Sequence, residues 1–443
     1  MKNKKLVMLS YVFPPRGVVG GSIRIIKFLK YLHELQEQIN PIIITPRIDH
    51  VYLNDPHHAE SLIEEIPPNV TIVRTNSLQP KHPNPEKIKA FSSSIKQNVS
   101  GKKKSVVKRF VKQIYNLFQR NILIPDYVVL WIPFMIREGL KQIRNENVEV
   151  IYATAPPFSV IIGGAILKKL TKRKLIVDIK DDWVYQTKFL EKNRFIQSIE
   201  RMLEKFVIKN ADKVILVTEM SYDDFQTRYP NMKNKFELIT NGCDVSEYEK
   251  TWEIEYPKNN KFIFLHAGVI NVTRNPINFL LALKTLKEEN IISADNFKME
   301  FIGPLPQEVW NNVRELNIDD IVFNSEFLAR GTFIDKLCRS DLLLAFNYNI
   351  HTLIPGKLYD YWGSRRSILL IDNQQSMAAK FVEKYNLGRS NSFDDVNGII
   401  ESIKYFFNKW KSDDKIEKLN VKELHNYDRK NLTKKLIDIF ESV

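Results

Sequence analysis

Short apolar runs alternate with helical patterns through the first half of the chain. Strand-length runs occur at Lys5–Ser10, Pro41–Thr45, Val148–Ala153, Lys174–Ile179, Lys213–Thr218 and Phe236–Thr240. Apolar positions with helical spacing follow the first run, from Ile23 to Leu35, and fill Ser159–Leu170, Phe189–Lys209 and Ser221–Arg228. Near-continuous apolar strands separated by helices predict a parallel sheet covered by helices on both faces.

The same rhythm starts again after a break. Asn241-Gly242 is a turn signal, and the polar stretch 244–260 shows no clear period, so we predict a hinge there. Strands are then expected at Lys261–Ala267, Phe297–Ile302, Ile321–Asn324, Asp341–Phe346 and Ser367–Ile371. Helices are expected at Pro276–Leu286, Gln307–Leu316, Thr332–Arg339, Gly356–Trp362 and Ser376–Lys384. The pattern therefore predicts a second α/β domain.

The predicted fold class is α/β, with two doubly wound Rossmann-like domains that face each other across a cleft. A chain of 443 residues is too long for one compact core, which also favours two domains. The expected parts are an N-terminal domain 1–243, the hinge 244–260, a C-terminal domain 261–424 and a final helix 425–443. Ligands of such sheets bind at the carboxyl ends of the strands.

Composition narrows the class of protein. Hydrophobic residues make up 44% of the chain, which excludes a disordered protein, and the only cysteines, Cys243 and Cys338, cannot form a disulfide framework. The apolar runs are shorter than the roughly 20 residues that a membrane-spanning helix needs. We therefore expect a cytoplasmic protein with unpaired thiols, soluble or bound peripherally to the inner face of the membrane.

A formal net charge of +14 indicates a polyanionic partner such as anionic lipid, a phosphorylated substrate or nucleic acid. The segment 87–125 carries ten Lys or Arg residues and no acidic residue. Within it, apolar positions from Val106 to Phe118 follow helical spacing, with Lys103, Lys104, Lys108 and Lys112 on other faces. This pattern predicts a basic amphipathic helix that binds an anionic membrane surface, or alternatively packs on the first domain.

Three stretches have the chemistry of a phosphate site. Gly20-Gly21 opens a helix, with Arg24 in its first turn, and free N–H groups there favour an anion. Gly268 ends a strand, with Arg274 just before the next helix. In the third stretch, Pro355 and Gly356 begin a helix beside Lys357, and Asp360 lies one turn later, where a carboxylate could accept ribose hydroxyls. Ordinary loops and a capped amphipathic helix are the alternatives.

A charged run, Asp178-Ile179-Lys180-Asp181-Asp182-Trp183, follows a predicted strand. If the sheet is parallel, this strand end points to the ligand-binding edge. A solvated loop is the alternative, and we expect it for Asp182 because runs of charge are usually solvated.

The order of these motifs resembles glycosyltransferase family 4, a family of the GT-B fold, and within it a bacterial branch that builds surface polysaccharide. The motifs that carry the resemblance are Tyr11-Val12-Phe13-Pro14-Pro15 with Gly20-Gly21-Ser22, Ala153-Thr154-Ala155-Pro156-Pro157, the run from Asp178 to Trp183, Asn210-Ala211-Asp212, Asn241-Gly242-Cys243-Asp244 and Pro355-Gly356-Lys357-Leu358-Tyr359-Asp360-Tyr361. They extend from Tyr11 to about Gly388. Two positions depart from the family pattern, because Thr352 and Asp360 stand where the family often has two glutamates.

The resemblance implies a retaining transferase that moves a sugar from a nucleotide-sugar donor to a lipid-linked or glycan acceptor, without a cofactor or an obligatory metal. It assigns the binding of the donor to nine residues: Gly20, Gly21, Arg24, Gly268, Arg274, Pro355, Gly356, Lys357 and Asp360. It places Lys180 and Asp181, the candidate catalytic residues, near the reacting centre. The sequence has no Asp-x-Asp motif after a strand, which would indicate a metal site. Its eight histidines are not spaced as metal ligands are.

Two other functions are compatible with the same architecture. One is a nucleotide-sugar epimerase, although no acid/base pair stands out in the sequence. The other is a catalytically inactive GT-B scaffold, suggested by Thr352. Nucleic-acid binding is not expected, since the chain has no reader motif and no aromatic-basic interleaving.

Overall fold

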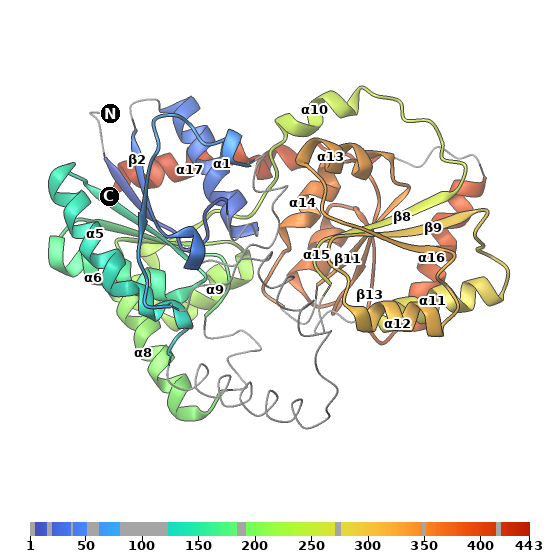
Figure 1. The fold of residues 1–443 in the computed structure, drawn as a ribbon, viewed down its shortest axis with the longest axis horizontal. Helices are drawn as coiled ribbons and strands as arrows, with labels where there is room; N and C mark the ends of the chain where they lie inside the picture. The colour runs from blue at the N-terminus through green and yellow to red at the C-terminus, as the bar shows by residue number, and fades with distance from the viewer. Residues whose placement is uncertain are drawn as a thin grey trace, which may run out of the picture. The chain divides into compact units, whose positions relative to one another are not determined.

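The computed structural model describes residues 5–15, 20–36, 39–50, 62–79, 123–183, 192–270, 276–347, 351–412 and 418–443. The chain forms two compact units, the first made of Met1–Leu238 with Leu436–Val443 and the second of Ile239–Lys435. In each unit a twisted sheet lies between layers of helices (Figure 1). The predicted hinge, 244–260, falls within the second unit and includes the helix α10, Ser246–Trp252.

The first unit has a seven-stranded parallel sheet in the order β3-β2-β1-β4-β5-β6-β7. Its strands are β1 Leu6–Leu9, β2 Pro41–Pro46, β3 Thr71–Thr75, β4 Val150–Ala155, β5 Lys174–Ile179, β6 Lys213–Leu216 and β7 Phe236–Leu238. The central strands β1 and β4 are buried along their whole length, because helices cover both faces. Those helices are α1 Gly20–Leu35, α5 Ile132–Asn145, α6 Phe158–Thr171, α8 Arg194–Asn210 and α9 Glu219–Arg228.

The second unit repeats this plan with a six-stranded parallel sheet in the order β10-β9-β8-β11-β12-β13. Its strands are β8 Phe262–Ala267, β9 Phe297–Ile302, β10 Val322–Ser325, β11 Leu342–Phe346, β12 Ile368–Ile371 and β13 Gly388–Asn391. The helices around it are α11 Ile277–Glu288, α12 Gln307–Glu315, α13 Arg330–Arg339, α14 Gly356–Gly363, α15 Met377–Lys384 and α16 Val396–Lys411. The last helix of the chain is α17, Arg429–Ser442.

The predicted fold class, two doubly wound α/β domains, is confirmed. The strand Lys174–Ile179 has the predicted bounds, and α14 extends one residue beyond the predicted Gly356–Trp362. Sequence analysis does not predict the outer strands β3 and β13. Both lie at a sheet edge and are only partly buried, so neither carries the continuous apolar run that marks the central strands.

The structure also bears on the predictions for the cysteines, membrane spans and the basic segment. Cys243 and Cys338 are unpaired, as expected, and both are buried. Among the helices that the structure describes, none combines the length and apolar character that crossing a bilayer requires. The basic segment around Val106–Phe118 lies outside the described residues, and its helix stays a prediction.

Candidate active site

The carboxyl end of β8 in the second unit carries the first predicted donor residue. Gly268 follows the strand with a φ of +131°, a conformation that residues with a side chain rarely adopt. A β-carbon placed on Gly268 would lie 2.8 Å from Nζ of Lys357. The glycine therefore permits both the turn of the chain and the close approach of an ammonium group to the end of the strand.

Lys357 belongs to α14, whose first turn is built from the predicted donor motif. Pro355 is the N-cap residue, and no side chain caps the helix. A β-carbon on Gly356 would meet no heavy atom within 4 Å, so the space beside this first residue is open. An uncapped first turn with open space and a nearby cation has the properties of an anion site. The structure thus brings Gly268, Pro355, Gly356 and Lys357 together.

The buried side of α14 fixes its position against β8. The Oη atom of Tyr361 accepts a hydrogen bond of 2.9 Å from the backbone N–H of Ala267, the last residue of β8. Leu358, Tyr359 and Trp362 are also buried. Because these core contacts anchor the helix, its first turn is held at the carboxyl end of the strand.

Asp360 faces a polar cluster that sequence analysis does not predict. Its Oδ1 accepts hydrogen bonds from Tyr248 Oη and Arg330 Nη2, each at 2.7 Å. The same guanidinium donates to Glu247 Oε2 at 2.7 Å through Nη2 and at 3.1 Å through Nε. Burial alone would lower the pKa of Arg330, but Asp360, Tyr248 and Glu247 raise it well above its usual range. Arg330 is therefore a fixed positive charge that orients Asp360.

In the first unit, Arg24 lies one turn into α1 with its guanidinium fully buried. It donates to both carboxylate oxygens of Asp178, at 3.0 Å and 3.3 Å, and Tyr152 donates to Asp178 at 2.5 Å. Neither Arg24 nor Asp178 has an exposed side chain, at 0% each. In this structure the Arg24 guanidinium thus holds α1 to the end of β5, and its predicted donor contact stays a prediction. The same holds for Gly20 and Gly21, where α1 begins.

The candidate catalytic residues Lys180 and Asp181 follow β5 directly. The backbone N–H of Lys180 bonds to the carbonyl of Ala155, which extends the β4–β5 pairing beyond the strand. Burial lowers the pKa of the Lys180 ammonium to about 8, with Arg24 acting in the same direction and Asp178 and Asp181 against it. Asp181 is half-buried. Lys180 is therefore a lysine whose charge responds to mildly alkaline pH.

The expectation of a solvated Asp182 is wrong. Its side chain is 5% exposed and accepts a hydrogen bond of 2.9 Å from Ser221 Oγ. Ser221 in turn accepts one from Thr218, the N-cap residue of α9. The general rule for charge runs fails here because the first turn of α9 covers this residue. Trp183 is also buried and stacks on Phe158 with ring centroids 4.7 Å apart.

One predicted donor residue, Arg274, lies outside the described residues. Of the others, Gly268, Pro355, Gly356, Lys357 and Asp360 belong to the second unit. Gly20, Gly21, Arg24, Lys180 and Asp181 belong to the first.

Comparison with known proteins supports the fold. A sequence model of the family described as Glycosyltransferase Family 4 matches residues 108–247. No curated protein matches the chain. The solved sucrose-phosphate synthase from Thermosynechococcus elongatus is 11% identical with a TM-score of 0.68, covering 99% of this chain and 98% of that one. A glycosyltransferase from Rickettsia africae is 13% identical with a TM-score of 0.65, covering 100% and 99%.

The fold alone does not decide the reaction. The UDP-GlcNAc 2-epimerase from Methanocaldococcus jannaschii is also similar, with 10% identity, a TM-score of 0.55, and coverage of 99% of this chain and 100% of that one. The match to the glycosyltransferase model covers 108–247, which is mostly in the first unit. The chain therefore has the GT-B fold, and its residues 108–247 match the model of glycosyltransferase family 4.

Proposed function

We propose that this protein is a retaining glycosyltransferase that moves a sugar from a nucleotide-sugar donor to a lipid-linked or glycan acceptor, in the synthesis of a surface polysaccharide. The position of Lys357 is the observation that supports the binding of a nucleotide-sugar donor. Its ammonium nitrogen is buried and stands within contact distance of Gly268, at the carboxyl end of β8. Doubly wound sheets bind their ligands at that edge.

The donor diphosphate would lie on the first turn of α14. Backbone N–H groups from Gly356 onward would donate to its oxygens, and the Lys357 ammonium would balance their charge. As the bond to the sugar breaks, negative charge builds on the leaving diphosphate, so fixed donors at this point stabilise the transition state more than the ground state. Arg274 would add a second cation.

The nucleoside would be held by Asp360. Its Oδ1 already accepts hydrogen bonds from Tyr248 and Arg330. A carboxylate has further lone pairs, so Oδ2 is suited to accept a ribose hydroxyl. Asp360 is one methylene shorter than the glutamate of the related motif, and a carboxylate oriented by Arg330 compensates for part of that loss in reach.

In the first unit, Lys180 and Asp181 would act on the reacting groups or the acceptor. A lysine with a pKa of about 8 is partly neutral near physiological pH, so it can exchange a proton as well as supply a charge. Arg24, through Asp178, would hold the strand end that carries them. We assign neither residue as a base.

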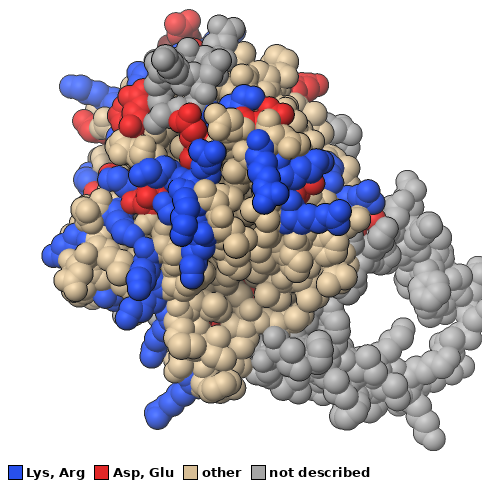
Figure 2. All heavy atoms as spheres, turned by 90° about the vertical axis from the view of Figure 1, so that its left-hand side faces the viewer, with Lys and Arg blue, Asp and Glu red and all other residues tan. Residues whose placement is uncertain are grey.

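The enzyme would bind its acceptor at an anionic membrane surface, on the cytoplasmic side of the membrane. Figure 2 shows Lys and Arg side chains spread over one face of the first unit, with fewer acidic ones between them. Exposed basic residues of α5 and of the region from α6 to β5 include Arg137, Lys141, Arg144, Lys169, Lys172 and Lys174. Together with the basic segment 102–120, they would draw the enzyme to anionic lipid.

A panel of UDP-, GDP- and ADP-sugars, scored by thermal shift, tests the donor assignment. A donor that binds only the folded protein raises its melting temperature with concentration. We expect one nucleotide class to stabilise the wild type and to have a much smaller effect on the Lys357→Ala variant. Equal stabilisation of both proteins by every sugar nucleotide would reject the proposed site. Product analysis then separates transfer to an acceptor from epimerisation of the free donor.

A further inference from the structure

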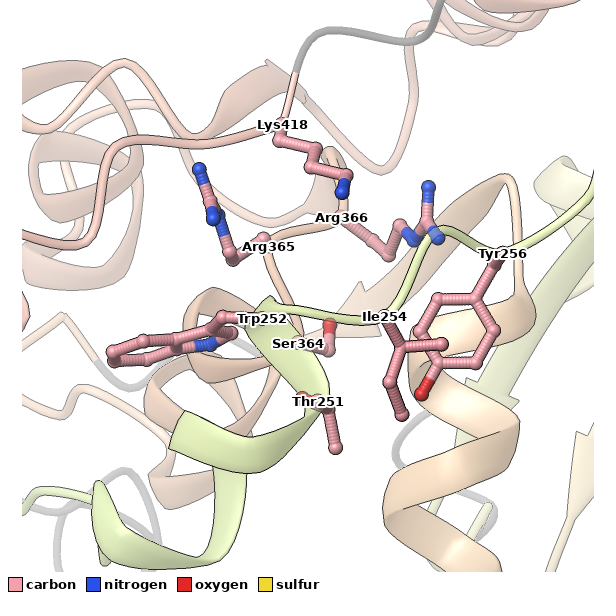
Figure 3. A pocket seen from close by; sticks show the side chains of 8 residues that line it. All are labelled: Thr251, Trp252, Ile254, Tyr256, Ser364, Arg365, Arg366 and Lys418. Carbon is pink, nitrogen blue, oxygen red and sulfur yellow. The ribbon is translucent and has the colours of Figure 1, made fainter.

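A second pocket of the second unit lies away from the donor residues. It is a small hollow, partly open to solvent, beside α10 and the end of α14 (Figure 3). Three basic residues, Arg365, Arg366 and Lys418, line it together with Trp252, Ile254 and Tyr256.

The pocket is at the opposite edge of the sheet from Lys357. Arg365 and Arg366 precede β12, which begins at Ile368, so they mark the amino end of that strand. Gly268 and the first turn of α14 mark the carboxyl end of the parallel sheet. A ligand in this pocket would therefore be separate from a donor bound at the carboxyl edge.

The three basic side chains line the same pocket, and Asp341 is the acidic residue that acts on Arg366. Arg365 Nε donates to the backbone carbonyl of Leu419 at 3.1 Å, and Arg366 Nε donates to that of Cys338 at 2.7 Å. These bonds fix each guanidinium at its Nε atom. None of the three basic side chains forms an ion pair within the part of the chain that the structure describes. Figure 3 shows the Lys418 amine and both guanidinium groups around the same space.

The Arg366 guanidinium lies in the field of both a carboxylate and a second guanidinium. Burial lowers the pKa of Arg366, and the nearby charge of Arg365 lowers it further, against the attraction of Asp341. Like charges brought together repel each other, and a bound anion would offset the repulsion between the two arginines.

The backbone of Arg365 is a second, independent sign that its side chain is needed here. Arg365 follows α14 with a φ of +60°. Of the other described non-glycine residues with positive φ, four are asparagines (Asn147, Asn290, Asn317 and Asn386) and one is Lys172, which follows α6. Asparagine and glycine suit this position, whereas a long side chain there is disfavoured. Arginine therefore occupies a place where the backbone alone would favour another residue.

The floor of the pocket is apolar. Ile254, one of the lining residues, is 46% exposed. Trp252 and Tyr256 flank it, and Trp252 is held by a hydrogen bond from Nε1 to the carbonyl of Gly363. Cations above an apolar floor suit a ligand with an anionic head and a less polar body.

From these observations we propose that this pocket is a second anion site, which binds the phosphate group of a small phosphorylated molecule. Arg365 and Arg366 supply guanidinium donors, which match the geometry of phosphate oxygens, and Lys418 supplies a mobile point charge. Trp252 and Ile254 contact the organic part of the ligand. The phosphate comes from a soluble metabolite or from a lipid head group.

Calorimetric titration of the full chain with inorganic phosphate tests the site. The titration is done in the Lys357→Ala background, so that the proposed donor site contributes little heat. Lys418→Gln removes one pocket charge from an exposed residue and is not expected to affect folding. Lys422→Gln is the matched control, since Lys422 is also exposed, lies nearby in the chain and does not line the pocket. We expect Lys418→Gln to weaken phosphate binding about tenfold and the control to change it less than twofold.

Equal phosphate affinity in the Lys418→Gln and Lys422→Gln proteins would overturn the proposal, as would an absence of phosphate binding in the Lys357→Ala background. Co-sedimentation with phosphatidylglycerol vesicles then identifies the source of the phosphate. If Lys418→Gln weakens both phosphate and vesicle binding, the ligand is a lipid head group. If only phosphate binding weakens, it is a soluble phosphorylated molecule.

Discussion

Arg330 Nη2 lies 2.7 Å from Asp360 Oδ1 and 2.7 Å from Glu247 Oε2, so one buried guanidinium joins α14 to α10. The side chains of Arg330 and Glu247 are each 16% exposed and that of Asp360 is 21% exposed, so water screens this ion pair only partly. We infer that the arginine sets the direction of the carboxylate proposed to hold the donor ribose.

Replacing this arginine should therefore impair donor binding. We expect Arg330→Met to raise the KM for the donor about tenfold, with a smaller effect on the KM for the acceptor. Arg330→Lys should recover part of the donor affinity, because an ammonium restores the positive charge but cannot bond to Asp360 and Glu247 with the planar geometry of a guanidinium. Arg339→Met on the same helix is the control, since its guanidinium is 54% exposed and pairs with Asp335. Equal donor KM values for Arg330→Met and Arg339→Met would contradict the positioning role.

The low pKa of Lys180 predicts a dependence of stability on pH. The ammonium has a pKa of about 8 in the folded protein, against a usual value of 10.5. Above pH 8 the folded protein has released this proton while the unfolded chain still holds it, so the lysine favours folding more as pH rises toward 10.5. From pH 7 to pH 9.5 the free energy of unfolding of the wild type should rise by about 2 kcal/mol relative to Lys180→Met.

Urea unfolding of both proteins at the two pH values measures this difference in the free energy of unfolding. Groups that titrate equally in both proteins do not contribute to it. A difference that stays constant with pH would show that Lys180 titrates normally, and it would remove the basis for a proton-exchange role.

Transfer should not require a divalent metal ion. The reason lies in the proposed site, where Lys357 and the N–H groups of α14 stabilise the leaving diphosphate in the way that a metal ion does in other transferases. We expect the rate in excess EDTA to stay within about twofold of the untreated rate. Loss of activity with EDTA, and its recovery with Mn²⁺ or Mg²⁺, would refute a metal-free mechanism.

The basic segment 102–120 is predicted to hold the enzyme on anionic membranes. Each Lys or Arg near an anionic leaflet contributes roughly 1 kcal/mol, so replacing Lys103, Lys104, Lys108 and Lys112 with Gln should release the protein from phosphatidylglycerol vesicles. The melting temperature should change little. Lys250, Lys261, Lys380 and Lys411 are exposed lysines of the second unit, and replacing them in the same way provides a charge-matched control that should still bind the vesicles. Sedimentation that is equal with neutral and anionic vesicles would defeat the prediction.

Much of the fold could be predicted because its strands are buried on both faces. The central strands β4, β5 and β11 have continuous apolar runs, which the sequence displays directly. Edge strands lack this signal: β13 reads Gly-Arg-Ser-Asn and becomes a strand only through its pairing with β12. The helix α14 could be predicted because its cap, glycine and apolar positions are all local in sequence.

The partners of the site residues could not be predicted in the same way. Arg330, Glu247 and Asp360 come from separate helices, and nothing in the sequence around Arg330 indicates that it bonds to the other two. Asp182 is buried for a similar reason, because Ser221 and Thr218 cover it from a helix that follows much later in the chain. Such pairings depend on tertiary packing, which periodicity and turn signals do not encode.

The rate of sugar transfer by the Lys357→Ala variant tests the central claim most directly. The control is Lys380→Ala. Lys380 is an exposed lysine of α15, so its replacement removes the same charge from the same unit. With saturating acceptor and an established donor, we predict that Lys357→Ala lowers kcat/KM by about 30- to 1000-fold, which corresponds to roughly 2–4 kcal/mol of transition-state stabilisation. The control should stay within twofold. A folded Lys357→Ala enzyme that turns over as fast as the Lys380→Ala enzyme would contradict the assignment of the donor diphosphate to α14.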